Sequence, residues 1–137
     1  MKRSTLAAVV LAASLLVITG CAAPKVARYG SVIGLKADKL DDYKQLHADC
    51  WPGVLGQIRD CNIRNYSIYL HQLDDDQYYL FSYFEYVGDD FEADMKKMAA
   101  DPTTQRWWKE TDPCQFAVKH RRADEFWAAM EEVFHCD

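Results

Sequence analysis

Runs of apolar and polar residues change period several times along the chain, and each change predicts a new element. Residues 29–35 (YGSVIGL) are short and largely apolar, as in a buried strand. Residues 65–71 (NYSIYLH) and 78–86 (YYLFSYFEY) are rich in Tyr, Ile and Phe, and the three aspartates at 74–76 separate them. This pattern predicts a β-hairpin. Residues 130–135 (MEEVFH) alternate like a final strand.

The segment between the first strand and the hairpin carries helical signals. Asp38 offers an N-cap for a helix that begins near Leu40. Pro52 disfavours helical geometry in the residue before it but suits a first turn. We therefore expect the helix to break near Pro52 and a second helical piece to cover residues 54–60.

The segment after the hairpin repeats this broken-helix pattern. Residues 89–100 place their large apolar side chains on one stripe, and Asp101 followed by Pro102 caps and starts another helical piece, which ends near Pro113. Residues 115–124 are basic and show no pattern, whereas residues 125–129 predict a helical turn.

The element order is therefore βαββαβ, which predicts an α+β, ferredoxin-like fold of the split-βαβ type. Such a subunit has an antiparallel sheet with both helical segments on one face. The other face of the sheet also needs a cover. Since no further element of the chain is left to provide it, we expect the same face of a second copy, and hence a homodimer.

The N-terminal residues predict an export signal. Lys2 and Arg3 precede an apolar run at residues 6–18, which is too short for a membrane span of ~20 residues, and Gly20 precedes Cys21. A bacterial lipoprotein signal over residues 1–20 is the favoured interpretation; an uncleaved anchor and a plain secretory signal remain alternatives.

The lipoprotein interpretation sets the expected domains and location. Cys21 would carry the lipid, residues 21–27 would form a tether and residues 28–137 the folded domain. The protein would be lipid-anchored in the bacterial cell envelope, facing the periplasm or the exterior. The chain has a net charge of −5, and loss of Lys2 and Arg3 makes it more acidic. An acidic surface argues against nucleic acid as a partner, and membrane contact should come from the lipid.

The remaining cysteines are Cys50, Cys61, Cys114 and Cys136, an even number in a compartment where disulfides form. In the split-βαβ plan we place the break of the first helical segment and the end of the second at one end of the sheet, which predicts Cys50 bonded to Cys114 and Cys61 bonded to Cys136. No C-x-x-C, H-x-x-x-H or H-x-H spacing occurs, so no metal site is expected.

Two groups of aromatic residues carry the candidate chemistry. Tyr43, His47 and Trp51 are spaced by four residues and lie along one face of a helix, and Trp107 and Trp108 are adjacent in a polar stretch. Indole faces cover the C–H faces of a pyranose, while a phenol and an imidazole can exchange protons with its oxygens. Together these residues predict a sugar site.

Simpler interpretations exist for several of these residues. His47 could be a structural histidine, and Tyr66 could be a packing residue of its strand. Trp51 is better explained as a core residue that fills the helix break. Trp107 and Trp108 cannot both face the core, since adjacent helical residues point ~100° apart. One of the two should meet a ligand or a partner subunit.

Four motifs in order make the chain resemble the L-rhamnose mutarotases over roughly residues 29–136. They are Tyr43-x3-His47-x3-Trp51-Pro52, residues 65–70 (NYSIYL), residues 106–109 (RWWK) and residues 132–134 (EVF). The resemblance implies a dimeric α/β barrel that interconverts the anomers of L-rhamnose without a cofactor. It also implies that His47 is the proton donor, and that the sugar is bound by Tyr43, Tyr66, Trp107 and Trp108.

Two hypotheses compete with a mutarotase. A non-catalytic envelope sugar-binding lipoprotein would use the aromatic residues without requiring the Tyr43 and His47 pair. An oxygenase of the wider dimeric α/β barrel group would share the fold alone. The lipoprotein signal, the aspartates at 74–76 and the extra cysteines depart from the family pattern.

Overall fold

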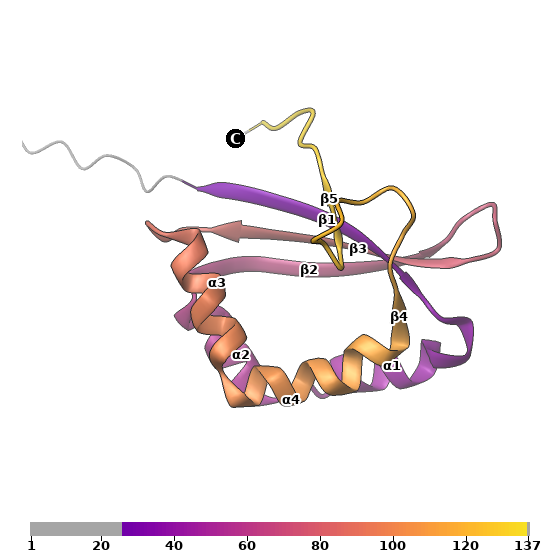
Figure 1. Cartoon of the computed structure of the whole chain (residues 1–137), viewed down its shortest axis with the longest axis horizontal. Coiled ribbons are helices and arrows are strands. Elements are labelled where there is room, and N and C mark those ends of the chain that lie inside the picture. Colours follow the sequence, from indigo (N-terminus) through magenta and orange to yellow (C-terminus); the bar gives the residue numbers. More distant parts are fainter. Residues whose placement is uncertain (1–25, 137) are drawn as a thin grey trace, which may run out of the picture.

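The protein is described here by a computed structural model that covers residues 26–136, and a curved five-stranded sheet forms its centre. Figure 1 shows the three long strands running together above a layer of helices. The strands are β1 (Ala27–Leu35), β2 (Ile63–Gln72), β3 (Tyr78–Tyr86), β4 (Gln115–Phe116) and β5 (Ala128–Met130).

The sheet has the strand order β2-β3-β1-β4, and β5 also pairs with β1. Both β1 and β2 are antiparallel to β3, so β3 lies between two strands that run in the same direction. This arrangement is the split βαβ unit, and it confirms the predicted ferredoxin-like topology.

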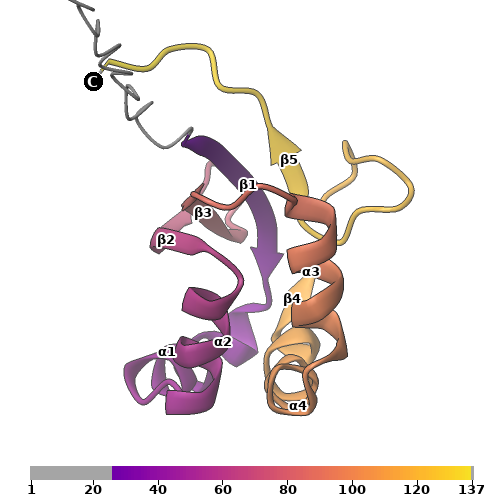
Figure 2. The same cartoon turned by 90° about the vertical axis from the view of Figure 1, so that its left-hand side faces the viewer.

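The helices cover one face of the sheet in two broken segments. They are η1 (Ala37–Lys39), α1 (Leu40–Ala48), α2 (Pro52–Asp60), α3 (Phe91–Ala100), α4 (Pro102–Thr111) and η2 (Asp112–Cys114). Figure 2 shows α1 and α2 on one side and α3 and α4 beside them.

Local sequence explains both breaks. Pro52 and Pro102 occupy first turns, where the missing N–H costs no hydrogen bond. The Asp101 side chain also caps α4 by accepting a hydrogen bond of 2.7 Å from the Thr104 amide. The predicted breaks near Pro52 and at 101–102 are therefore confirmed.

The core lies at the end of the sheet where β1 meets the start of α1. Ile33, Leu35 and Leu80 are essentially inaccessible, and Tyr43 and Cys114 pack against them. Burial of each aliphatic side chain contributes about 1.5–3 kcal/mol. This packing fixes the start of α1 on the sheet. It thereby sets the distance between the sheet and the residues further along α1.

The C-terminal part of the chain differs from the expected one. The last strand covers 128–130 instead of 130–135, and residues 125–127 form no helical turn. Val133 is 89% exposed and Phe134 81% exposed. The alternation at 130–135 predicts a strand, but within residues 26–136 these two side chains find no surface to bury against. By contrast, residues 115–124, which show no pattern in the sequence, contain the short strand β4.

Neither predicted disulfide is present, because Cys50, Cys61 and Cys114 are free thiols. The start of α1, not its end, lies beside η2, since Tyr43 and Cys114 share the core cluster. Cys50 lies at the other end of α1. Cys61 is buried at the end of α2, where the Gln57 side-chain amide donates to its sulfur over 3.4 Å, and Cys136 follows in the extended C-terminal segment. The error was to place the helix break and the end of α4 at the same end of the sheet.

The predicted signal at 1–20, the lipid site Cys21 and most of the tether at 21–27 lie outside the described residues. Within residues 26–136, no helix combines the length and the apolar character needed to cross a membrane.

Candidate functional site

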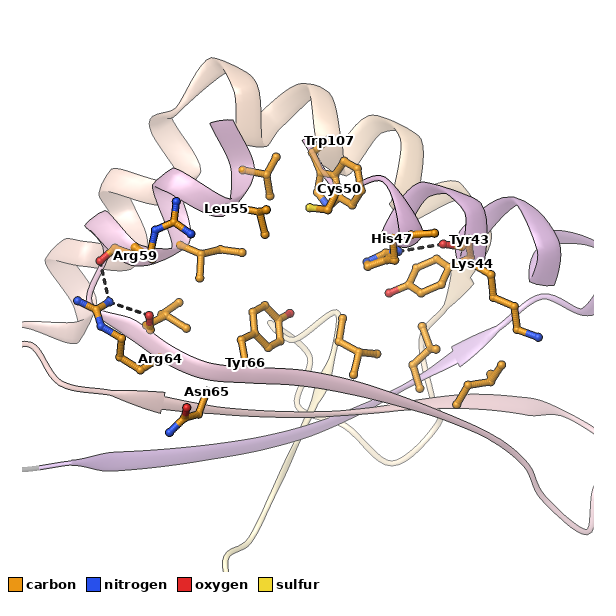
Figure 3. A pocket seen from close by; sticks show the side chains of 17 residues that line it. Tyr43, Lys44, His47, Cys50, Leu55, Arg59, Arg64, Asn65, Tyr66 and Trp107 are labelled. Atoms are coloured by element: carbon orange, nitrogen blue, oxygen red, sulfur yellow. Dashed lines mark hydrogen bonds between the residues drawn. The ribbon is translucent and has the colours of Figure 1, made fainter. Parts of the chain in front are cut away.

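Two adjoining cavities lie between the helices and the sheet. One has a volume of about 770 Å³ and is bounded mainly by α1, α2 and β2; the other, of about 470 Å³, extends toward α4, β4 and the loop before β5. Tyr43, His47, Tyr66 and Trp107 line both of them. Figure 3 shows these side chains converging from α1, β2 and α4 on the first cavity. The structure therefore brings the predicted site residues together.

His47 is oriented by its own helix. Its ring stacks on Tyr43 one turn earlier, with centroids 4.1 Å apart and planes inclined by 29°. The Nδ1 atom lies 2.9 Å from the Tyr43 carbonyl oxygen. Because a carbonyl can only accept, Nδ1 carries the hydrogen and Nε2 is left with a lone pair on the cavity side.

The protonation state of His47 follows from its surroundings. Burial lowers its pKa from the ordinary value of 6.5, and the hydrogen bond to the Tyr43 backbone opposes this in part. At neutral pH the imidazole is therefore uncharged, and Nε2 can take a proton from a bound hydroxyl.

Tyr43 is 5% exposed and supplies a neutral phenol. Burial, the largest cause, raises the pKa of this phenol far above its ordinary value of 10. The group therefore stays protonated and acts as a hydrogen-bond donor. The i, i+4 spacing on α1 places this donor and the basic Nε2 of His47 side by side.

Trp107 and Trp108 differ in exposure, as their spacing on the helix predicts. Trp107 is 6% exposed and meets His47 edge-on, with ring centroids 5.2 Å apart. Trp108 is 37% exposed and lines the second cavity. Trp51 packs edge-on against Trp107 at 5.4 Å and faces a separate surface hollow, in agreement with a structural role.

Tyr66 reaches the cavity because of an irregularity in β2. The register with β3 shifts between Arg64 and Ser67, so that two residues oppose one, and Asn65 adopts a left-handed conformation with φ 49°. The Tyr66 ring meets Phe84 edge-on at 5.6 Å. Although Tyr66 is 43% exposed within the open cavity, desolvation by the surrounding protein raises its pKa.

Several polar residues of the site were not foreseen. Ser31 and Ser82 share a hydrogen bond of 2.6 Å between their hydroxyls and line the second cavity together with Gln115. Ser31 could have been found from its sequence, because it lies two and four residues before the core residues Ile33 and Leu35 and so faces the same side. Gln115 lies in the segment that showed no pattern.

Metal-ligating side chains do not gather anywhere in residues 26–136, since no group of three or more His, Cys, Asp or Glu is placed to hold an ion. The arrangement at the cavity is instead one of an imidazole base, a phenol donor and aromatic faces. Such a set can bind a polyhydroxylated ring and move a proton between two of its oxygens.

The fold and the cavity define an α+β subunit of the ferredoxin-like type with an acid–base site suited to a sugar. The chain belongs to the L-rhamnose mutarotase family, whose pattern it matches over residues 28–136.

Individual relatives agree with this assignment. An L-rhamnose mutarotase of Bacillus subtilis (strain 168) is 36% identical over 86 residues, which cover 63% of this chain and 77% of the relative. The L-rhamnose mutarotase of Oceanobacillus iheyensis is 32% identical over 112 residues, covering 80% of this chain and 98% of the relative. The crystal structure of an L-rhamnose mutarotase from Formosa agariphila superposes with a TM-score of 0.60 at 21% identity, covering 81% and 99% of the two chains.

Proposed function

We propose that the protein interconverts the α and β anomers of L-rhamnose, or of a closely related 6-deoxyhexose. The observation that carries this proposal is the geometry of His47: its Nδ1 is fixed on a carbonyl, and its basic Nε2 faces the cavity beside the Tyr43 phenol. Membership of the family supports L-rhamnose as the substrate.

The reaction needs one proton to move between two neighbouring oxygens of the sugar. Nε2 of His47 takes the proton of the anomeric hydroxyl as the bond from C1 to the ring oxygen breaks. The Tyr43 hydroxyl donates a hydrogen bond to the negative charge that develops on the ring oxygen. The imidazolium then gives its proton to that oxygen, which completes the open aldehyde.

Ring closure reverses these steps after rotation about the bond from C1 to C2. His47 takes the proton back from the former ring oxygen and returns it to the anomeric oxygen, now on the other face. No proton or electron is gained or lost overall. Proton transfer by a positioned side chain typically contributes about 10²- to 10⁴-fold, which is useful for a reaction that water already performs slowly.

The aromatic faces account for binding. Trp107 and Trp108 offer indole surface to the cavities, and Tyr66 projects from β2 on the opposite side. A 6-deoxyhexose carries a methyl group and several axial or equatorial C–H bonds, which pack on such faces.

Polarimetry of freshly dissolved, crystalline L-rhamnose tests the proposal. The rotation of one pure anomer relaxes to that of the equilibrium mixture, and catalytic amounts of protein should shorten this relaxation without changing its end point. A relaxation time equal to that in buffer would refute the proposed activity.

The subunit should act as a homodimer, joined through the face of the sheet that the helices leave uncovered. Leu80, Ser82 and Phe84 face the helices, so the intervening Phe81 and Tyr83 face away from them. Phe81 pairs in register with Tyr69, which is 64% exposed. An exposed aromatic row of this kind is typical of a protein interface.

The envelope location is a further part of the proposal. Its support is the charged, apolar and Gly20-Cys21 pattern of the N-terminal residues. If Cys21 carries the lipid, the full-length protein fractionates with membranes and the Cys21→Ser variant does not. A full-length, uncleaved precursor in the cytosol would disprove the anchor while leaving the enzymatic proposal intact.

A further inference from the structure

Gln115 carries a buried polar atom that the fold itself does not use. The residue is 6% exposed, and within residues 26–136 its side-chain carbonyl oxygen, Oε1, has no hydrogen-bond partner. It lines the second cavity, together with Tyr43, His47 and Trp108. Buried acceptors are nearly always paired, so an unpaired one inside a binding cavity points to a ligand that completes it.

The backbone holds this side chain in place. Gln115 opens β4 and pairs with Leu35 of β1, a residue of the core. Antiparallel partners point to the same face, so Gln115 faces the helices while Phe116 lies over Gly34 on the other face. The hydrogen bond of 2.9 Å from the Lys36 amide to the Cys114 carbonyl fixes the chain just before it.

Gln115 and Tyr43 line the same cavity. The Gln115 side chain lowers the pKa of the Tyr43 phenol, against the larger effect of burial.

We propose that Gln115 is a specificity-determining residue of the sugar site. Its Oε1 accepts a hydrogen bond from one sugar hydroxyl. The inference rests on the proposed function. It assigns to Gln115 the recognition of one ring hydroxyl, which the corresponding deoxy sugar lacks.

A substrate panel combined with Gln115→Met tests the hydroxyl contact. Affinities for L-rhamnose and its 2-, 3- and 4-deoxy analogues are measured by tryptophan fluorescence, with the exposed Gln45→Met as the matched control. In the wild type one analogue should bind roughly tenfold or more weakly than L-rhamnose. In Gln115→Met this difference should vanish, whereas Gln45→Met should keep it. If Gln115→Met keeps every ratio of the wild type, the proposal is wrong.

Thermal unfolding of the same variant excludes a merely structural role. Replacement of an unpaired buried amide by a side chain of similar volume should leave the melting temperature unchanged or raise it. A marked fall would show that the amide holds the fold together, and would overturn the proposal.

The two levels of the proposal can fail separately. If the wild type binds sugars without accelerating anomer exchange, the proposed function is wrong, and the affinities still decide whether Gln115 contacts a hydroxyl. If the wild type binds no sugar of the panel, both are wrong.

Discussion

At the scale of single residues, one hydrogen bond decides what His47 can do. The Tyr43 carbonyl holds the hydrogen on Nδ1, which leaves Nε2 as the reactive atom, and burial keeps the ring uncharged near neutrality. The same helical turn supplies the Tyr43 phenol. The pair therefore presents a proton acceptor and a hydrogen-bond donor to the same cavity.

The pH dependence of the rate follows from these two groups. The neutral imidazole is the active form, and burial lowers its pKa, so kcat/KM should be constant at neutral pH and fall in acid with a midpoint below 6.5. Because burial raises the pKa of Tyr43, no alkaline limb should appear up to pH 10. Anomer exchange measured across pH, with the rate in buffer subtracted, checks both limbs; an acid midpoint above 6.5 would contradict a buried, neutral His47.

The two adjacent tryptophans should respond differently to truncation. Trp107 is buried against His47 and Trp51, so Trp107→Ala should destabilise the fold by about 3–5 kcal/mol. Trp108 is partly exposed at the second cavity, so Trp108→Ala should lower sugar affinity by about 1 kcal/mol at nearly unchanged stability. Urea unfolding and fluorescence titration separate the two effects. Equal losses of stability would argue against this division.

At the scale of elements, the irregularity in β2 is what turns Tyr66 toward the cavity. Asn65 adopts φ 49°, and its amide donates to the Glu85 carboxylate over 2.6 Å. Ile63 lines the cavity, so regular alternation along β2 from Ile63 would point Tyr66, three residues later, away from the helices. The bulge shifts the pattern by one residue.

Two substitutions at Asn65 separate backbone conformation from the hydrogen bond. Asn65→Gly keeps the left-handed conformation but loses the contact with Glu85, whereas Asn65→Val disfavours the conformation itself by roughly 1–2 kcal/mol. We expect Asn65→Val to lower sugar affinity clearly more than Asn65→Gly does, as measured by fluorescence titration. Similar affinities for the two variants would mean that the bulge does not position Tyr66.

Local and distant determinants explain which elements could be predicted from the sequence. The breaks at Pro52 and at 101–102 depend on proline and an aspartate cap within the same few residues, and the hairpin depends on its own polar turn. The bulge at Asn65, the burial of Gln115 and the position of β5 depend on strand pairing with distant residues. The disulfide prediction failed for the same reason, since it required the relative placement of Cys50 and Cys114.

The candidate site was predictable to a similar extent. Tyr43 and His47 follow from helical spacing, and Trp107 and Trp108 from their angular separation on α4. Tyr66 required the resemblance to the family, because a tyrosine in a strand is more often a packing residue. Gln115 was missed because a short strand of two residues leaves no periodic pattern.

At the scale of the whole molecule, the proposed homodimer forms through the uncovered face of the sheet. Tyr69 and Phe81 form part of an aromatic row on the side away from the helices. A charge placed there would be buried without a partner in a dimer but would remain hydrated in a monomer.

Tyr69→Asp should therefore shift the protein from dimer to monomer, while Gln45→Glu on the outer side of α1 should not. Sedimentation equilibrium over a range of concentrations measures the change. A wild type that stays monomeric at all concentrations would contradict the proposed assembly, and an unaffected dimer in Tyr69→Asp would place the interface elsewhere.

The most direct test of the proposed enzyme is saturation-transfer NMR between the H1 signals of α- and β-L-rhamnose at equilibrium. The wild type should transfer saturation faster than buffer, and His47→Asn should lose about 10²- to 10⁴-fold of that acceleration while it keeps sugar affinity within a few-fold. The exposed His120→Asn serves as the matched control and should behave like the wild type. Exchange at the rate of buffer in the wild type, or full activity of His47→Asn, would contradict the account.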